Sequence, residues 1–163
     1  MLTIRPARAE DAAAILTVHR EAILARAAGH YPPEALAAWG AGVTPERLAR
    51  AHQRLADPAF LTLIAEAGGA VIGFAEAAPA RGELRALYVK ANGIGRVGTA
   101  LLFELEKRAF TETGSLTCDA SLNAAPFYAA HGYVEEARTE HLLSAGIALP
   151  CVRMKKVRRT TKE

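Results

Sequence analysis

The sequence predicts an α/β (α+β) domain whose mixed, mostly antiparallel central sheet has six to seven strands flanked by about four helices. Segments with the alternation of strands and segments with the apolar period of helices follow one another in the order β-α-α-β-β-β-α-β-α-β-β. A length of 163 residues fits one domain with a core of its own. A hydrophobic content of 51% and a charged content of 23% lie near the globular average, which disfavours both disorder and a coiled coil.

The first third of the chain is expected to contain one strand followed by helices. The predicted elements are a strand at residues 2–5, a helix from about 8 to 28, and a helical region at 34–39 and 44–56. Thr44 is the expected N-cap of the last of these helices, because its hydroxyl can accept a hydrogen bond from the first turn. Pro45 suits the first helical position.

The rest of the chain is expected to form most of the sheet. The predicted elements are strands at 60–65, 70–77 and 83–89, a helix at 99–110, a strand at 115–120, a short helix at 123–130, and strands at 133–136 and 150–155. Gly68-Gly69 is the expected turn of a hairpin. Leu101, Leu102 and Leu105 share one face of the expected long helix, which predicts that this face is buried.

The net charge of +3 is unevenly distributed along the chain. Residues 153–163 carry six basic residues and one acidic residue, so the remaining 14 basic and 16 acidic residues leave the rest of the chain at −2. We therefore expect a folded domain over residues 1–156 and a basic C-terminal tail over 157–163. Such a tail can contact nucleic acid, but no nucleic-acid-binding motif accompanies it, so no nucleic-acid partner is expected.

The chain also lacks the sequence features of a membrane or exported protein. No uncharged stretch approaches the ~20 apolar residues that a membrane span needs, so no membrane partner is expected. Charges at Arg5, Arg8 and Glu10 stand where a signal peptide would be apolar, which predicts a cytoplasmic protein. Cys118 and Cys151 match no zinc or redox spacing, so we expect buried thiols and no metal.

The most informative segment is residues 84–102, in which a strand runs into a glycine-rich loop that opens a helix. Glycines let backbone N–H groups approach an anion, and the helix N-terminus adds partial positive charge, so a phosphate or pyrophosphate site is expected. The spacing Gly93-x-Gly95-x-x-Gly98 satisfies a nicotinamide dinucleotide pattern, with Asp119 about twenty residues later. Too little chain follows Asp119 for the remaining strand–helix units of that fold, so a dinucleotide enzyme is the weaker interpretation.

The other interpretation of this loop rests on a family resemblance. Three features carry it: the strand end Leu87-Tyr88-Val89, the glycine-rich turn into Leu101-Leu102, and the later pattern Asn123-Ala124-x-x-Phe127-Tyr128-x-x-x-Gly132-Tyr133. Over nearly its whole length the chain resembles the GNAT superfamily of N-acetyltransferases. The resemblance implies a GNAT-like acyl-CoA N-acyltransferase fold, with acetyl-CoA as the cosubstrate and no metal.

The glycine loop departs from the family pattern in one respect. The family usually has Arg or Gln, two variable residues, Gly, one variable residue, and then Gly or Ala before the helix. Counting back from Gly98 places Arg96 at the first glycine and Gly93 at the Arg or Gln, so the loop looks one residue short. The cofactor-binding residues that the resemblance implies are Leu87, Tyr88, Val89, Gly93, Ile94, Gly95, Arg96, Val97, Gly98, Thr99, Asn123, Phe127 and Tyr128.

The resemblance also implies direct transfer of an acetyl group to a primary amine in a ternary complex. Tyr128 matches the family's general acid, because a phenol can share a proton with a departing thiolate. Glu83, at the start of the strand before the loop, is the candidate base; it could equally be an exposed strand-end glutamate, and Glu76 is held in reserve. Asn123 is expected to hydrogen-bond the coenzyme arm, to cap the following helix, or to do both.

The acceptor, a small-molecule or peptide amine, is expected between the first two helices and a loop at 139–149. His30, Tyr31 and Trp39 are expected where the substrate would pass, each either as a substrate contact or as packing. Because a fold does not determine an activity, a non-catalytic acyl-CoA-binding domain stays as the alternative. An edge strand near the C-terminus makes a homodimer plausible.

Overall fold

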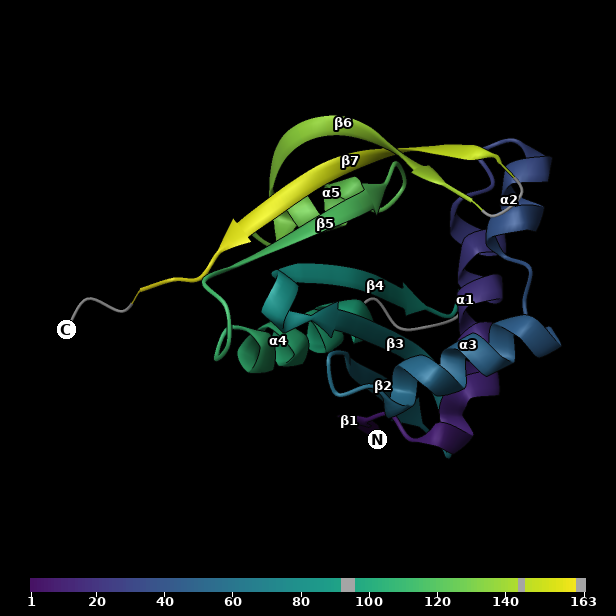
Figure 1. Cartoon of the computed structure of the whole chain (residues 1–163), viewed down its shortest axis with the longest axis horizontal. Coiled ribbons are helices and arrows are strands. Elements are labelled where there is room, and N and C mark those ends of the chain that lie inside the picture. The colour runs from purple at the N-terminus through teal and green to yellow at the C-terminus, as the bar shows by residue number, and fades with distance from the viewer. Residues whose placement is uncertain (92–95, 144–145, 161–163) are drawn as a thin grey trace.

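The computed structural model describes residues 1–91, 96–143 and 146–160, and over these residues it contains one seven-stranded sheet and five α-helices (Figure 1). The strands are β1 (Leu2–Pro6), β2 (Leu61–Ala67), β3 (Ala70–Ala78), β4 (Glu83–Val89), β5 (Ser115–Ser121), β6 (Val134–Leu142) and β7 (Ala148–Val157). The helices are α1 (Ala12–Arg26), α2 (Pro33–Trp39), α3 (Pro45–Ala56), α4 (Val97–Ala109) and α5 (Ala125–Ala130), with 3-10 turns η1 (Ala9–Asp11) and η2 (Pro79–Arg81). The predicted fold class is confirmed.

The strands lie in the order β1-β2-β3-β4-β5-β7-β6. All neighbours are antiparallel except β4 and β5, which are parallel because α4 crosses over between them. Gly68 and Gly69 join β2 to β3 with φ of 59° and 77°, the left-handed backbone that a tight hairpin turn requires and that glycine tolerates. The sheet is therefore mostly antiparallel, with one parallel step at its centre.

Helices cover both faces of the β1–β4 half of the sheet (Figure 1). Because side chains alternate along a strand, Leu63 of β2 turns toward α4 while its neighbour Ile64 turns toward α1. On β3 the same alternation sends Phe74 and Glu76 to the α1 side, where α3 packs against α1. Polar residues that reach this second face therefore lie under α3.

The start of α3 agrees with the sequence prediction. The Thr44 hydroxyl accepts a hydrogen bond from the Arg47 backbone N–H at 3.2 Å, and Pro45 is the first helical residue. The N-cap orients the first turn of α3, and the arginines that follow it are then carried along a regular helix.

The last two strands are longer than the sequence predicted. We expected strands at 133–136 and 150–155 with a loop at 139–149, whereas β6 runs from Val134 to Leu142 and β7 from Ala148 to Val157. Eight of the nine β6 residues are exposed, and the remaining one, Thr139, is half-buried. β6 therefore lacks the apolar alternation that identifies a strand in a sequence. Its pairing with β7 determines its length instead.

The last strand ends at Val157, next to the predicted division between a domain at 1–156 and a tail at 157–163. β7 includes Val157, and the next residue, Arg158, donates from its backbone N–H to the Gly114 carbonyl and from its guanidinium to the Phe110 carbonyl, at 2.8 and 2.7 Å. These hydrogen bonds hold Arg158 against the domain, and the division into domain and tail stays a prediction. β6 forms one edge of the sheet, and the homodimer that such an edge suggests stays a prediction.

Across residues 1–91, 96–143 and 146–160, no helix has the length and apolar character needed to cross a membrane.

Candidate active site

The centre of the sheet opens between β4 and β5. These strands pair at Glu83 and Thr117, where the Thr117 N–H also donates to the Gly82 carbonyl at 2.8 Å. Beyond this point the described residues of the two strands form no further pair, and they separate toward their carboxyl ends (Figure 1). A β-bulge in β4 accompanies the opening. Glu76 of β3 pairs with Ala86, but the next residue of β3 pairs with Leu84, so Arg85 has no partner in the ladder. Bulges of this kind redirect side chains next to functional sites.

Two cavities meet in this opening. One, of about 470 Å³, lies between the second half of β4, the end of β5, α1 and α5; we call it the α5 cavity. The other, of about 880 Å³, lies beneath α1 and α3 on the other side of the opening; we call it the α3 cavity. The residues that line both cavities are Trp39, Leu84, Arg85, Ala86, Tyr88, Asp119 and Ser121. Molecules bound in the two cavities can therefore meet at the gap between β4 and β5.

Tyr128 lies in the α5 cavity on the helix that follows β5. Its ring makes edge contacts with Phe127 and Tyr133, each at 5.4 Å between centroids. Burial, followed by the nearby Cys118 and Tyr88, raises the pKa of the Tyr128 phenol well above its usual value. The phenol therefore keeps its proton at neutral pH and can serve as a donor, but not as a base.

Asn123 lines the same cavity, just before α5. Its side-chain oxygen is buried and has no hydrogen-bond partner among the described residues. The N-cap residue of α5 is Ala124, and no side chain accepts a capping hydrogen bond from the first turn of this helix. The predicted capping role of Asn123 is therefore wrong. Because a buried amide oxygen without a donor is unfavourable, Asn123 is suited to receive an N–H from a molecule in the α5 cavity.

The start of α4 is the described part of the glycine loop, since Gly93, Ile94 and Gly95 lie outside the described residues. Of the four candidates that remain there, Gly98 lines the α5 cavity. The remaining three turn elsewhere: Arg96 is the exposed N-cap of α4, Val97 is buried in the core, and Thr99 contacts His131 at 3.0 Å between its hydroxyl and the ring Nε2.

Gly98 faces two side chains that line the same cavity. A β-carbon there would lie 3.4 Å from Phe127 Cε2 and 3.7 Å from Leu87 Cδ2. Leu87, Tyr88 and Val89 form the opposite wall of the α5 cavity, on the edge of β4 that β5 has left. Phe127, another predicted binding residue, lines the cavity beside Gly98.

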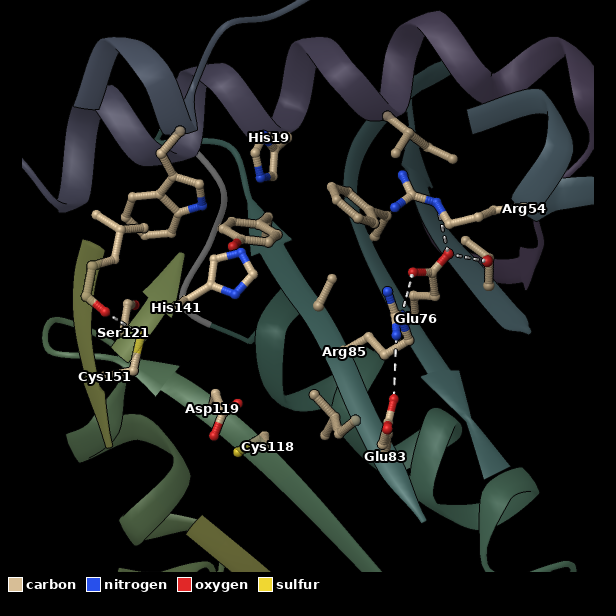
Figure 2. A pocket seen from close by; sticks show the side chains of 18 of the residues that line it. His19, Arg54, Glu76, Glu83, Arg85, Cys118, Asp119, Ser121, His141 and Cys151 are labelled. Atoms are coloured by element: carbon tan, nitrogen blue, oxygen red, sulfur yellow. Dashed lines mark hydrogen bonds and ion pairs between the residues drawn. The ribbon is translucent and has the colours of Figure 1, made fainter. Parts of the chain in front are cut away.

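The two candidate bases lie in the α3 cavity with arginine partners (Figure 2). Glu76 is buried and lies 3.8 Å from Arg54 and 3.6 Å from Arg85, and it accepts a hydrogen bond from Thr62 at 3.2 Å. Glu83 is more exposed and has a single arginine partner, Arg85, at 3.2 Å. Glu83 is therefore the freer of the two carboxylates, and it lies where β4 and β5 begin to separate.

Asp119 was not among the predicted catalytic residues, yet it is the one carboxylate in the described lining that borders both cavities. It lies on β5, and its carboxylate receives a hydrogen bond from Arg153 at 3.1 Å. Its position near a strand end was visible in the sequence, but the sheet order determines that it shares one cavity with Tyr128 and the other with Glu83.

The residues that the sequence suggested as acceptor contacts have different positions. Trp39 lines both cavities, and His30 lines the α5 cavity. Tyr31 is buried, and its hydroxyl donates to the Pro150 carbonyl and accepts from the Leu122 N–H at 3.0 Å, so it ties β5 to β7. Tyr31 is thus a packing residue, whereas Trp39 belongs to the site.

His19 of α1 projects into the α3 cavity (Figure 2). It packs against Tyr88 with 4.6 Å between ring centroids. Burial lowers the pKa of His19 to about 3, with smaller contributions from the nearby positive charges of Arg47 and Arg54. The imidazole is therefore neutral at physiological pH. Across the described residues, no group of three or more His, Cys, Asp or Glu side chains is placed to hold a metal ion.

Comparison with known proteins identifies the family. The profile described as an acetyltransferase (GNAT) domain matches residues 27–158. A crystal structure of a GCN5-related N-acetyltransferase from Rhodopseudomonas palustris has a TM-score of 0.86 at 34% identity, covering 96% of this chain and 95% of that chain. This chain belongs to the GNAT acetyltransferase family.

Other GNAT structures share the fold at lower identity. PaiA N-acetyltransferase from Thermoplasma acidophilum, in complex with coenzyme A, has a TM-score of 0.74 at 24% identity and covers 97% of this chain and 99% of that chain. YncA from Salmonella typhimurium, a putative acetyltransferase with acetyl-CoA, has a TM-score of 0.69 at 22% identity and covers 100% of this chain and 98% of that chain. No curated protein matches the chain.

Proposed function

We propose that this GNAT protein transfers the acetyl group of acetyl-CoA to a primary amine by direct attack in a ternary complex. One observation carries the proposal: β4 and β5 separate beyond Glu83, and a cavity opens on each side of the gap. Two reactants can therefore approach one point from opposite directions. That PaiA and YncA structures contain coenzyme A and acetyl-CoA supports the choice of cosubstrate.

The residues of the α5 cavity fit the pantetheine arm and pyrophosphate of acetyl-CoA. The unpartnered Asn123 oxygen can accept an N–H from an amide of the arm. The edge of β4 at Leu87–Val89 offers backbone groups to which an extended chain can bind as an added strand. Gly98 keeps the start of α4 free of a side chain, which suits the close approach of a phosphate group.

In this proposal each site residue has a distinct task. When bound, acetyl-CoA supplies an activated acetyl thioester. Glu83 accepts a proton from the amine as its nitrogen bonds to the carbonyl carbon, and Tyr128 donates its phenol proton to the sulfur as the carbon–sulfur bond breaks. A backbone N–H of the free β4 edge stabilises the negative charge that develops on the carbonyl oxygen. The products are an amide and free coenzyme A.

The two cysteines of the α3 cavity favour direct transfer over an acetyl-cysteine route. Burial, with a smaller effect of Asp119, raises the pKa of Cys118 to about 12 and also raises that of Cys151. Since the thiolate is the nucleophilic form, both thiols are poor nucleophiles at neutral pH. The amine is thus the nucleophile in our proposal.

The decisive experiment measures acetyl-CoA binding by calorimetry and thiol release with a panel of amines. We expect binding by the wild type and amine-dependent thiol release, with an N-acetylated product detected by mass spectrometry. Binding without any release, hydrolysis or product would favour the alternative, a non-catalytic acyl-CoA-binding domain. Failure to bind coenzyme A would contradict both. The cytoplasmic location expected from the sequence stays a prediction.

A further inference from the structure

We propose that the amine acceptor also carries an anionic group, a carboxylate or a phosphate, and that Arg47 and Arg50 of α3 bind it. The inference rests on the proposed function and names the class of its second substrate. It concerns the α3 cavity, which lies across the β4–β5 opening from the α5 cavity.

The lining of the α3 cavity is rich in arginine. Its described residues include three carboxylates, all of which have arginine partners: Glu76, Glu83 and Asp119. They also include six arginines: Arg47, Arg50, Arg54, Arg81, Arg85 and Arg153. The described lining therefore has three more arginines than carboxylates. An ammonium group alone would find such a cavity repulsive.

Arg47 and Arg50 are the cations best placed to bind an anion. Neither forms an ion pair with a carboxylate of residues 1–91, 96–143 or 146–160, unlike Arg54, the third arginine on this helix. Their spacing of three and then four residues places all three arginines on one face of α3, and all three line the cavity. Neighbouring like charges on one helix face repel one another, and an anion between them would remove the repulsion.

Arg47 is also held in position before any ligand binds. Its Nε donates to the Gly42 carbonyl at 2.9 Å, and its Nη2 lies 3.4 Å from His19 Nδ1. Because His19 is neutral, it can accept from Arg47 without compensating its charge. A guanidinium held in this way keeps N–H groups free for a planar oxyanion, and arginine binds carboxylate and phosphate in a bidentate manner.

Matched pairs of amines test the proposal. The pairs are L-amino acids and their carboxamides for the carboxylate, and phosphoethanolamine and ethanolamine for the phosphate, with spermidine as a polycation. We expect kcat/KM for the anionic member to exceed that of its neutral partner by about tenfold or more in one type of pair, the range of a charge-assisted hydrogen bond. The pair that responds identifies the anion. Equal or better use of every neutral partner, or preference for spermidine, would overturn the inference.

Two variants and a matched control locate the effect. Arg50→Gln and Arg47→Gln should lower kcat/KM for the anionic amine about tenfold, mostly through KM, and should lower it less for the neutral partner. Arg108→Gln changes an arginine on α4, outside both cavities, and should leave the ratio between partners unchanged. An equal loss for both partners would mean that the arginines support structure, and would contradict the inference.

A binding measurement separates failure of this inference from failure of the proposed function. If no amine releases thiol, the transferase proposal fails. Calorimetry with phosphoethanolamine and with an amino acid, on the coenzyme A-loaded protein, then still decides the inference. Binding of an anionic amine to the wild type that weakens about tenfold in Arg50→Gln supports it. Binding that does not distinguish the anionic amine from its neutral partner overturns it.

Discussion

The α5 and α3 cavities share the β4 segment but differ in what lines them. The α5 cavity is lined by the free edge of β4, the start of α4 at Gly98 and the aromatic rings of α5. It also contains the Asn123 side-chain oxygen, which is buried and has no hydrogen-bond partner among the described residues. The α3 cavity has six arginines contributed by α3, η2, β4 and β7. The described lining of the α5 cavity has two arginines, Arg26 and Arg85, against six in the α3 cavity, so side-chain charge is concentrated on the α3 side. The contrast suggests that one side of the gap serves a common cosubstrate and the other selects the acceptor.

The largest expected effect comes from removing the proton donor of the α5 cavity. Tyr128→Phe keeps the ring packing but removes the hydroxyl, so kcat should fall by about 10²–10⁴, the range of general-acid catalysis. Acetyl-CoA affinity should hardly change, because the hydroxyl acts mainly as charge develops on sulfur. The measurement is kcat together with the Kd of acetyl-CoA. Turnover within about threefold of the wild type would rule out the acid role.

The second prediction concerns the base on the α3 side of the gap. Glu83→Gln should lower kcat by about 10² if Glu83 accepts the amine proton. Asp119→Asn is the matched comparison, because Asp119 borders both cavities and also has an arginine partner. Steady-state kinetics on both variants decides between them. A large loss in Asp119→Asn with little change in Glu83→Gln would transfer the role to Asp119.

The third prediction tests the shape of the α5 cavity. In Gly98→Val, added methyl groups would crowd Phe127, which already lies 3.4 Å from the position of a β-carbon. A valine side chain at the start of α4 would occupy space that a phosphate group needs, so acetyl-CoA affinity should fall by about tenfold or more. Gly114→Val is the control, because a β-carbon there meets no atom within 4 Å. Calorimetry showing equal affinity in the two variants would remove Gly98 from the site.

The smallest predicted effect is on the pH dependence of folding stability, and it tests whether His19 adds positive charge to the α3 cavity. Burial lowers the pKa of His19 to about 3, while an unfolded histidine has a pKa of about 6.5. As the pH falls from 7 to 5, the unfolded chain gains a proton that the folded chain does not, so His19 lowers the folding stability.

The His19→Asn variant removes this proton linkage. Its loss of stability between pH 7 and pH 5 should be smaller than that of the wild type by about 1–2 kcal/mol. Urea unfolding of both proteins at the two pH values measures the difference. An identical loss in the two proteins would mean that His19 keeps an ordinary pKa in the folded protein and becomes protonated there between pH 7 and pH 5.

Local patterns in the sequence determined much of the fold. The order of strands and helices, the hairpin turn at Gly68-Gly69 and the Thr44 cap could all be predicted, because each depends on residues near one another in the chain. The sequence also singled out Tyr128 and Asn123, through a resemblance to a family. β6 was mostly missed, because a polar edge strand has no apolar alternation and exists through its pairing with β7.

The composition of the site was decided by tertiary structure. Arginines from four separate elements converge on one cavity, Asp119 borders both cavities, and the Asn123 oxygen has no partner among the described residues. None of these follows from local spacing, because each depends on which strands are neighbours and where two of them separate. The sequence by itself determined the family and most of the elements. The parting of β4 and β5 beyond Glu83, a long-range feature of the sheet, decided which side chains meet.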